Sequence, residues 1–182
     1  MAQERRNSQA GGRLSSPLED GPVTRLHICA DRISLEVVSG SNWRRLATLE
    51  AGSLRSILQH LRHEPAKEDE LEAAIAGIED DLMPAIRSLP ERRVLVTSAP
   101  EVWEIVRVAG LGGSSEVDLD IATVERLFNR MADVAYGTPA ARLGIPSGRA
   151  FAASLLMLRE VLHHGGFGSI MVMQSLPAAT IR

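Results

Sequence analysis

The stretch at residues 92–105, RRVLVTSAPEVWEI, most constrains the fold, because a short apolar strand leads there directly into a helix. Residues 94–97 show no alternation of polar and apolar side chains, which is typical of a strand covered on both faces. Ser98 and Glu101 have the spacing of a capping box, and Pro100 suits the first helical turn. A strand that enters a helix N-terminus often cradles a phosphate, usually with glycine in the turn. No glycine lies between this strand and Glu101.

The folded region is expected to begin at residue 23. Residues 1–22 show no hydrophobic periodicity and lack the apolar segment of a secretory signal, so we interpret them as a disordered tail. Residues 23–176 are long enough to form one domain with a buried core. Residues 177–182 are expected to be a short C-terminal tail.

Composition excludes several classes of function. The chain of 182 residues has a formal net charge of -3, which does not attract nucleic acid or an anionic membrane. No run reaches the roughly 18 apolar residues that span a membrane. The one cysteine, Cys29, excludes an internal disulfide and suits a reducing compartment. We therefore expect a cytoplasmic protein without nucleic-acid or membrane partners.

The order of expected elements indicates the fold class. Three strands come first, two helices follow, and two further strands alternate with helices; the strands are expected at residues 24–29, 33–38, 43–49, 94–97 and 169–173. The gap at residues 39–42, rich in Gly, Ser and Asn, is a hairpin loop. This order predicts a mixed five-stranded sheet with helices on both faces, the layout of a ribonuclease H-like or actin-like ATPase lobe.

The helices are expected at residues 53–63 and 67–89, and later after Ser98, after Asp118 or Asp120, and after Ser147. The last helix is expected to bury an apolar stripe of Phe151, Leu155, Leu158 and Leu162. Pro84 inside the second helix predicts a kink or a fresh helical turn. Residues 111–115, LGGSS, are expected to form a loop, and residues 136–147 to be mostly turn.

Three stretches together resemble the second lobe of the Ppx/GppA phosphatases, the exopolyphosphatase and guanosine pentaphosphate phosphohydrolase family. Residues 29–36, CADRISLE, occupy the position of the family's DIGGGSTE motif, and residues 96–100, VTSAP, that of its GTGGT-like turn. Residues 143–150, LGIPSGRA, resemble its GLPPERAD-like segment, and residues 172–174, VMQ, stand where Val-Ser-Asp is expected. The resemblance covers residues 26–176.

The resemblance implies three candidate site residues. Ser34 and Glu36 keep the positions of the family's catalytic strand-turn-strand motif, and Thr97 keeps a position in the phosphate-binding turn. An ordinary interpretation of Ser34 and Glu36 is a solvated strand face, and it remains open beside the catalytic one. The family's metal is magnesium, which this chain would need only if it retains activity.

The departures from the family argue against a phosphate site. Asp31, Arg32 and Ile33 replace glycines that let backbone N–H groups approach a phosphate. Cys29 replaces the acidic residue expected to hold a metal ion, and a thiol is a poor ligand for magnesium. In the second turn, Pro100 lacks an N–H group and Glu101 adds negative charge. We therefore expect both phosphate-binding turns to be non-functional and the domain to hold no metal or cofactor.

Other candidates have ordinary interpretations. His60 and His63 lie three residues apart on an expected helix, but no acid or cysteine completes a metal site there. His163 and His164 end a helix, where histidine interacts favourably with the helix dipole. The basic pairs at residues 44–45 and 92–93 are weak indications of a grip on polyphosphate.

Three hypotheses of function remain. The chain is a non-catalytic relative of the Ppx/GppA second lobe that acts as a binding or regulatory subunit, which is the hypothesis we favour. Alternatively, it is half of a split phosphatase that is active only with a separately encoded first lobe, since no segment of the sequence corresponds to that lobe. As a third alternative, it is a structural domain that assembles with itself.

Overall fold

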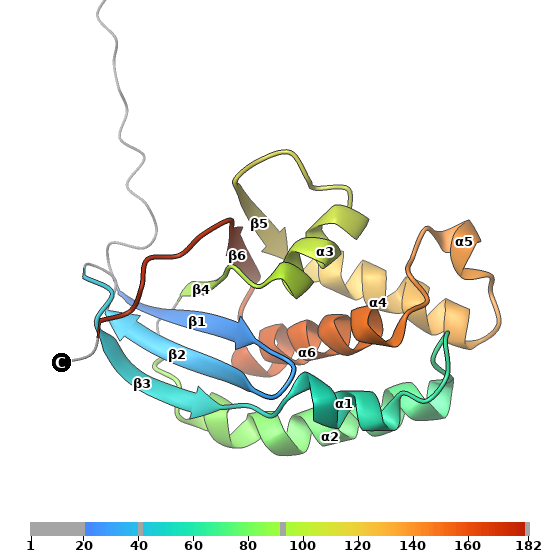
Figure 1. Ribbon diagram of the computed structural model, residues 1–182, viewed down its shortest axis with the longest axis horizontal. Coiled ribbons are helices and arrows are strands. Elements are labelled where there is room, and N and C mark those ends of the chain that lie inside the picture. The colour runs from blue at the N-terminus through green and yellow to red at the C-terminus, as the bar shows by residue number, and fades with distance from the viewer. Residues whose placement is uncertain (1–20, 40–41, 92–93, 181–182) are drawn as a thin grey trace, which may run out of the picture.

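A six-stranded mixed sheet forms the centre of the computed structural model, which describes residues 21–39, 42–91 and 94–180 (Figure 1). Its strands are β1 (Pro22–Ile28), β2 (Ile33–Ser39), β3 (Arg45–Glu50), β4 (Val94–Thr97), β5 (Glu116–Asp120) and β6 (Ser169–Met173). The strand order is β3-β2-β1-β4-β6-β5. The first three strands form the expected antiparallel meander, while β4 is parallel to both β1 and β6. The predicted fold class is confirmed.

The number of strands is corrected from five to six. The additional strand, β5, pairs antiparallel with β6 at one edge of the sheet. Only Leu119 is buried in it, and the side chains of Glu116, Asp118 and Asp120 are exposed. An edge strand with one solvated face has a weak hydrophobic signal, and its last residue, Asp120, is also the N-cap of the next helix.

In the described part of the chain, six helices accompany the sheet: α1 (Leu54–His60), α2 (Glu68–Arg87), α3 (Pro100–Val108), α4 (Ile121–Ala135), α5 (Ala140–Leu143) and α6 (Arg149–Gly165). Helix α6 lies at the centre of the helical layer, in contact with α1, α2, α3 and α4. Its buried residues include Leu155, Leu158 and Leu162, which are fully enclosed. The predicted apolar stripe of this helix is therefore confirmed. Helix α2 runs through Pro84 as one element.

The predicted helix caps are confirmed in part. Asp120, one of the two expected candidates, caps α4 through the backbone N–H of Thr123. Ser53, for which no cap was predicted, accepts a hydrogen bond from the backbone N–H of Ser56 at the start of α1. Ser98 is not a cap, because α3 begins one residue later with Ala99 in the N-cap position. Similarly, α6 is preceded by Gly148 rather than capped by Ser147. A short helix, α5, lies within the segment expected to be mostly turn.

The two faces of the sheet differ. The main core lies between one face and the helices, and α1, α2, α3, α4 and α6 all contribute buried side chains to it. The opposite face carries a smaller apolar cluster of Val23, Val38 and Val96, against which Trp43, Leu176 and Ala179 pack. We expected helices on both faces of the sheet. Helices pack on the first face, whereas the described residues of the second cluster lie in strands and loops.

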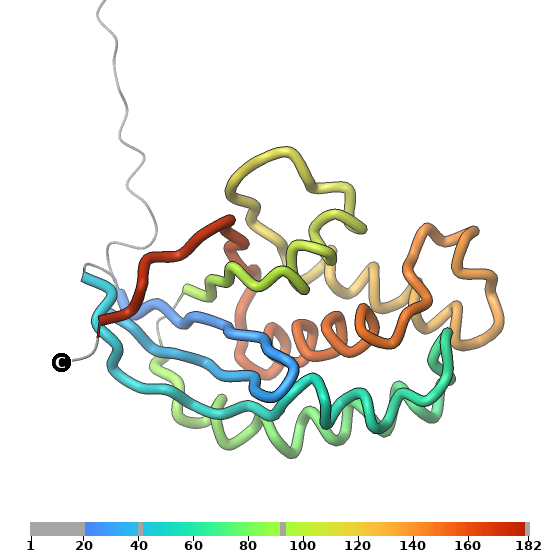
Figure 2. Tube along the Cα trace, viewed as in Figure 1, coloured from blue at the N-terminus to red at the C-terminus, as the bar shows by residue number. Residues whose placement is uncertain are grey.

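The segment after β6 returns along the second face to the start of β3 (Figure 2). The backbone N–H of Arg45 donates to the carbonyl of Thr180 at 3.0 Å, and Thr180 N–H donates to the carbonyl of Trp43 at 3.0 Å. The described part of the predicted C-terminal tail, residues 177–180, is therefore attached to the sheet.

Some predictions fall on residues outside the described ranges. These are the predicted disorder of residues 1–20, the centre of the hairpin loop at residues 40–41, and the basic pair at residues 92–93. Within the described ranges, no helix has the length and apolarity needed to cross a membrane.

Candidate functional site

The two turns that correspond to the family's phosphate-binding motifs lie at the same end of the sheet. Strand β4 is parallel to β1, with Arg25 beside Val96, so both strands end on the same side. The hydroxyl of Thr97 donates to the carbonyl of Leu26 across this pair at 2.9 Å. The structure therefore brings the predicted turns together, as a shared phosphate site requires.

The side chain of Thr97 is fully buried and used within the protein. Besides donating to Leu26, its oxygen accepts a hydrogen bond from the backbone N–H of Ala99 at 3.0 Å. One donor and one acceptor position of the hydroxyl are thus occupied by backbone groups. Thr97 fixes the turn between β4 and α3 through these two hydrogen bonds.

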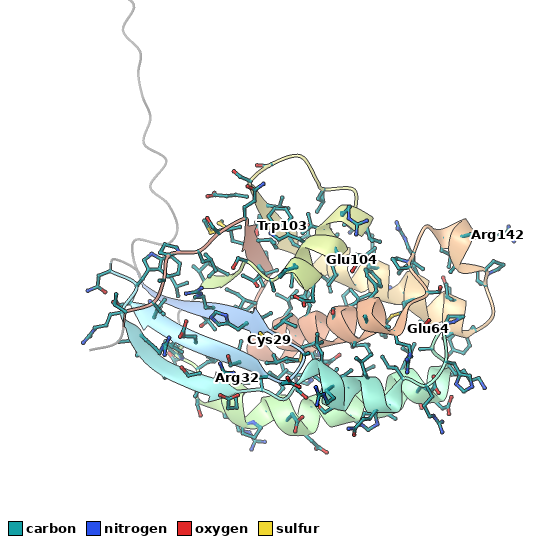
Figure 3. The ribbon with its side chains drawn as sticks, viewed as in Figure 1. Cys29, Arg32, Glu64, Trp103, Glu104 and Arg142 are labelled. Atoms are coloured by element: carbon teal, nitrogen blue, oxygen red, sulfur yellow. The ribbon has the colours of Figure 1, made fainter. Side chains whose placement is uncertain are left out.

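The start of α3 is unsuited to an anion. Pro100 occupies the first turn and has no N–H to offer, and Glu101 places a carboxylate in the same turn. One oxygen of Glu101, Oε2, is buried without a hydrogen-bond partner among the described residues. Farther along the helix, the indole N–H of Trp103 donates to the carbonyl of Met173 at 3.2 Å and attaches α3 to the end of β6 (Figure 3).

The turn between β1 and β2 is closed by a backbone hydrogen bond, and its charged side chains pair with neighbouring segments at the surface. The backbone N–H of Cys29 donates to the carbonyl of Arg32 at 2.9 Å, and both residues are seen at this turn in Figure 3. Asp31 pairs with Arg55 at 2.6 Å, and Arg32 lies 3.9 Å from Glu50. Cys29 is exposed and follows the last residue of β1, whereas we expected it to be the final residue of this strand.

Glu36 is buried among three basic side chains on the second face of the sheet. Its Oε2 lies 3.6 Å from Arg25 Nη1 and 3.3 Å from His27 Nε2, and its Oε1 pairs with Arg45 Nε. The side chain of Glu36 is only 6% exposed, and that of Arg25 is 11% exposed. Ser34, also buried, lies on this same face. Both carboxylate oxygens of Glu36 are thus engaged by basic side chains.

Arg25 is held by several groups at once. Its Nη1 donates to the carbonyl of Pro177 at 3.0 Å, and its guanidinium carbon lies 6.0 Å from the centre of the Trp43 ring. Burial lowers the pKa of Arg25, although the nearby carboxylate of Glu36 opposes that change. The C-terminal segment thus completes the environment of the Glu36 ion pairs.

Sequence reasoning missed the partners of Glu36. The basic pair at residues 44–45 was considered for polyphosphate, but Arg45 is bound to Glu36 instead. Arg25 stands directly opposite Glu36 in the β1–β2 register, and His27 lies one pair farther on the same face. The alternation of the two strands was a signal that could have found this pairing.

A shallow depression of about 730 Å³ flanks the start of α3. Pro100, Trp103 and Arg107 line one side of it, and Ser114, Ser115 and Gln174 line the other. It is open to solvent and contains both polar and apolar surface.

Comparison with known protein families finds no matching family, and comparison with curated protein sequences finds no match. Solved structures do match. A Ppx/GppA enzyme of Aquifex aeolicus superposes with a TM-score of 0.66 at 11% identity, covering 84% of this chain and 53% of that one. An exopolyphosphatase of Cytophaga hutchinsonii gives a TM-score of 0.64 at 14% identity, covering 86% and 54%. An exopolyphosphatase-like protein gives 0.59 at 13% identity, covering 84% and 54%.

The chain spans about half the length of each of these structures. Identities of this size show a common fold and do not carry over an activity. Because a single lobe of a two-lobed phosphatase would match in this way, the resemblance to one lobe is supported over nearly all of the described chain. The chain therefore has the fold of about half of a Ppx/GppA phosphatase.

Proposed function

We propose that the chain is a non-catalytic Ppx/GppA-like domain that acts by binding another protein, as a binding or regulatory subunit. The observation that carries the proposal is the state of the two turns at the ends of β1 and β4. They lie together, as a phosphate site requires, yet the first turn carries Asp31 and Arg32 in place of glycine and the retained hydroxyl of the second turn is bonded within the protein. The hydroxyl of Thr97, the one retained residue of the second turn, holds Leu26 and Ala99.

Electrostatics at the start of α3 supports the same conclusion. A carboxylate about 4 Å from a phosphate oxygen is repelled by about 1 to 4 kcal/mol per unit charge, depending on solvent exposure. Glu101 brings such a charge to the first helical turn, and Pro100 removes an N–H group that would offset it. The N-terminus of α3 is therefore expected to bind a phosphate more weakly than an ordinary helix N-terminus does.

Metal-assisted catalysis also lacks its usual residues in this region. Magnesium prefers carboxylate, carbonyl and water oxygens, whereas Cys29 offers a thiol at the position of the family's acidic residue. Glu36 is bound to Arg25, His27 and Arg45. We therefore propose that no magnesium ion is needed for the function of this domain.

The direct test is an assay of phosphate release from polyphosphate, ATP and guanosine pentaphosphate with magnesium, using an active exopolyphosphatase as positive control. The proposal predicts no release above the rate without protein. Magnesium-dependent release by the chain that disappears in Glu36→Gln would contradict it, provided that the variant remains folded.

A second candidate function is half of a split phosphatase, and the coverage of about 53% of the matched Aquifex structure favours it. This candidate requires a separately encoded first lobe that completes the site. The test is co-expression with such a lobe, followed by light scattering on a sizing column and the same phosphate assay. A joint peak with activity would support the split phosphatase, and a joint peak without activity would support the regulatory subunit. A concentration-dependent homo-oligomer would instead indicate self-assembly.

A further inference from the structure

A cluster of metal-ligating side chains lies between α2 and α6, two helices that pack side by side (Figure 1). Glu160 and His164 are one helical turn apart on α6, and Glu79 faces them from α2. His164 Nε2 lies 3.0 Å from Glu79 Oε1 and 3.2 Å from Glu160 Oε2. One ligand atom from each of the three residues lies within 4.8 Å of the other two.

Glu160 is the anchor of this cluster. Its side chain is 2% exposed, and its two oxygens have different partners. Oε1 accepts a hydrogen bond from Arg159 Nη1 at 2.6 Å, while Oε2 points to His164. Arg159 is itself fixed by Glu125 at 3.1 Å and by the ring of Phe128, 4.2 Å from its guanidinium carbon. A ligating carboxylate whose second oxygen is hydrogen-bonded in this way is typical of protein metal sites.

The charges of the cluster favour a divalent cation. Among the described ion pairs of this cluster, three carboxylates, those of Glu79, Glu125 and Glu160, accompany one guanidinium, that of Arg159, so these four formal charges sum to about -2. A divalent ion would offset both of these charges. The side chains of Glu79 and His164 are 45% and 24% exposed, so an ion can enter from solvent.

We propose that Glu79 Oε1, Glu160 Oε2 and His164 Nε2 bind one divalent transition-metal ion of the zinc class. One imidazole nitrogen and two carboxylate oxygens suit zinc, whereas magnesium prefers oxygen ligands alone. Three protein ligands leave the fourth tetrahedral position to water. The ion would link α2 to α6, and this site is separate from the turns at the ends of β1 and β4.

The test is calorimetric titration of the metal-free full chain with Zn²⁺ alone, together with its unfolding midpoint. Cys29→Ser serves as the parent, because an exposed thiol also binds zinc. The parent is expected to bind one ion per chain with a raised midpoint. Glu79→Gln and His164→Gln, at partly exposed positions, are each expected to weaken binding by at least about tenfold. His163→Gln changes the neighbouring exposed histidine and is expected to bind like the parent.

The proposal is overturned if the parent does not bind zinc, or if Glu79→Gln and His164→Gln bind as tightly as the parent. Loss of binding in His163→Gln alone would also overturn it, because the ion would then occupy another site. Glu160→Gln tests the buried ligand if this variant folds. If it does not fold, the variants at the partly exposed positions, Glu79→Gln and His164→Gln, decide the question.

Discussion

Glu36→Gln distinguishes a structural carboxylate from a catalytic one. Glutamine keeps the shape of the side chain but removes its charge, which leaves Arg25, with a side chain only 11% exposed, in a buried position without a counterion. Breaking a buried ion pair by removing one partner typically costs about 3 to 5 kcal/mol. We expect about 3 kcal/mol, the lower limit, because Arg45 and His27 have side chains 35% and 40% exposed and can turn to water.

Urea unfolding measures this loss. With an m-value of about 2 kcal/mol/M, a loss of 3 kcal/mol lowers the midpoint by about 1.5 M at unchanged m. Glu104→Gln is the matched control, since Glu104 pairs with Arg107 at 3.5 Å on the surface of α3. An exposed pair of this kind contributes at most about 0.5 kcal/mol. Should Glu36→Gln stay within about 0.5 kcal/mol of the parent or exceed its stability, the structural role given to Glu36 is wrong.

Thr97→Val, which removes the hydroxyl at nearly constant volume, should lower the free energy of unfolding by about 1 to 3 kcal/mol through the unpaired backbone groups, whereas Ser98→Ala should change it by less than about 0.5 kcal/mol. Equal effects of the two substitutions in urea unfolding would contradict the structural role given to Thr97. Leu155→Ala should cost about 2 to 5 kcal/mol as a core truncation, and a negligible loss would mean that α6 is placed with the wrong face inward. Burial of Glu70 alone would raise its pKa, but hydrogen bonds from His63 and from backbone N–H groups outweigh burial and lower the pKa from 4.5 to about 2. Its contribution to stability should therefore be complete above about pH 4.5 and lost as the pH falls towards 2, and Glu70→Gln should lack this part of the acid dependence of unfolding.

The strongly patterned elements could be predicted from sequence. The strand at residues 94–97 and the apolar stripe of α6 have unambiguous hydrophobic signals, and both are confirmed. Strand β5 could not be predicted in the same way, because it is stabilised by pairing with β6 while its own side chains are mostly solvated. The cap of α3 was misplaced by one residue, since Ala99 takes the N-cap position and Pro100 begins the helix.

Contacts at the two sites could be predicted only where they follow from the spacing of residues within one strand pair or one helix. The β1–β2 register places Arg25 opposite Glu36, which strand alternation could have revealed. The contact of Arg25 with Pro177 could not be inferred, because it depends on the path of the chain after β6. In the cluster between α2 and α6, the spacing of Glu160 and His164 is readable from sequence. The contribution of Glu79 requires the packing of the two helices.

The most direct test of the account is thermal unfolding of the chain with and without magnesium together with polyphosphate, ATP or guanosine tetraphosphate. A ligand at 100 times its dissociation constant would stabilise the fold by about 2.7 kcal/mol, which raises the midpoint by about 5 to 11 °C for a domain of this size. We predict no shift with any of these ligands, because both turns at the ends of β1 and β4 are closed by internal contacts. A shift in the parent that disappears in Thr97→Val or Glu36→Gln would contradict the account and show that a phosphate site is present.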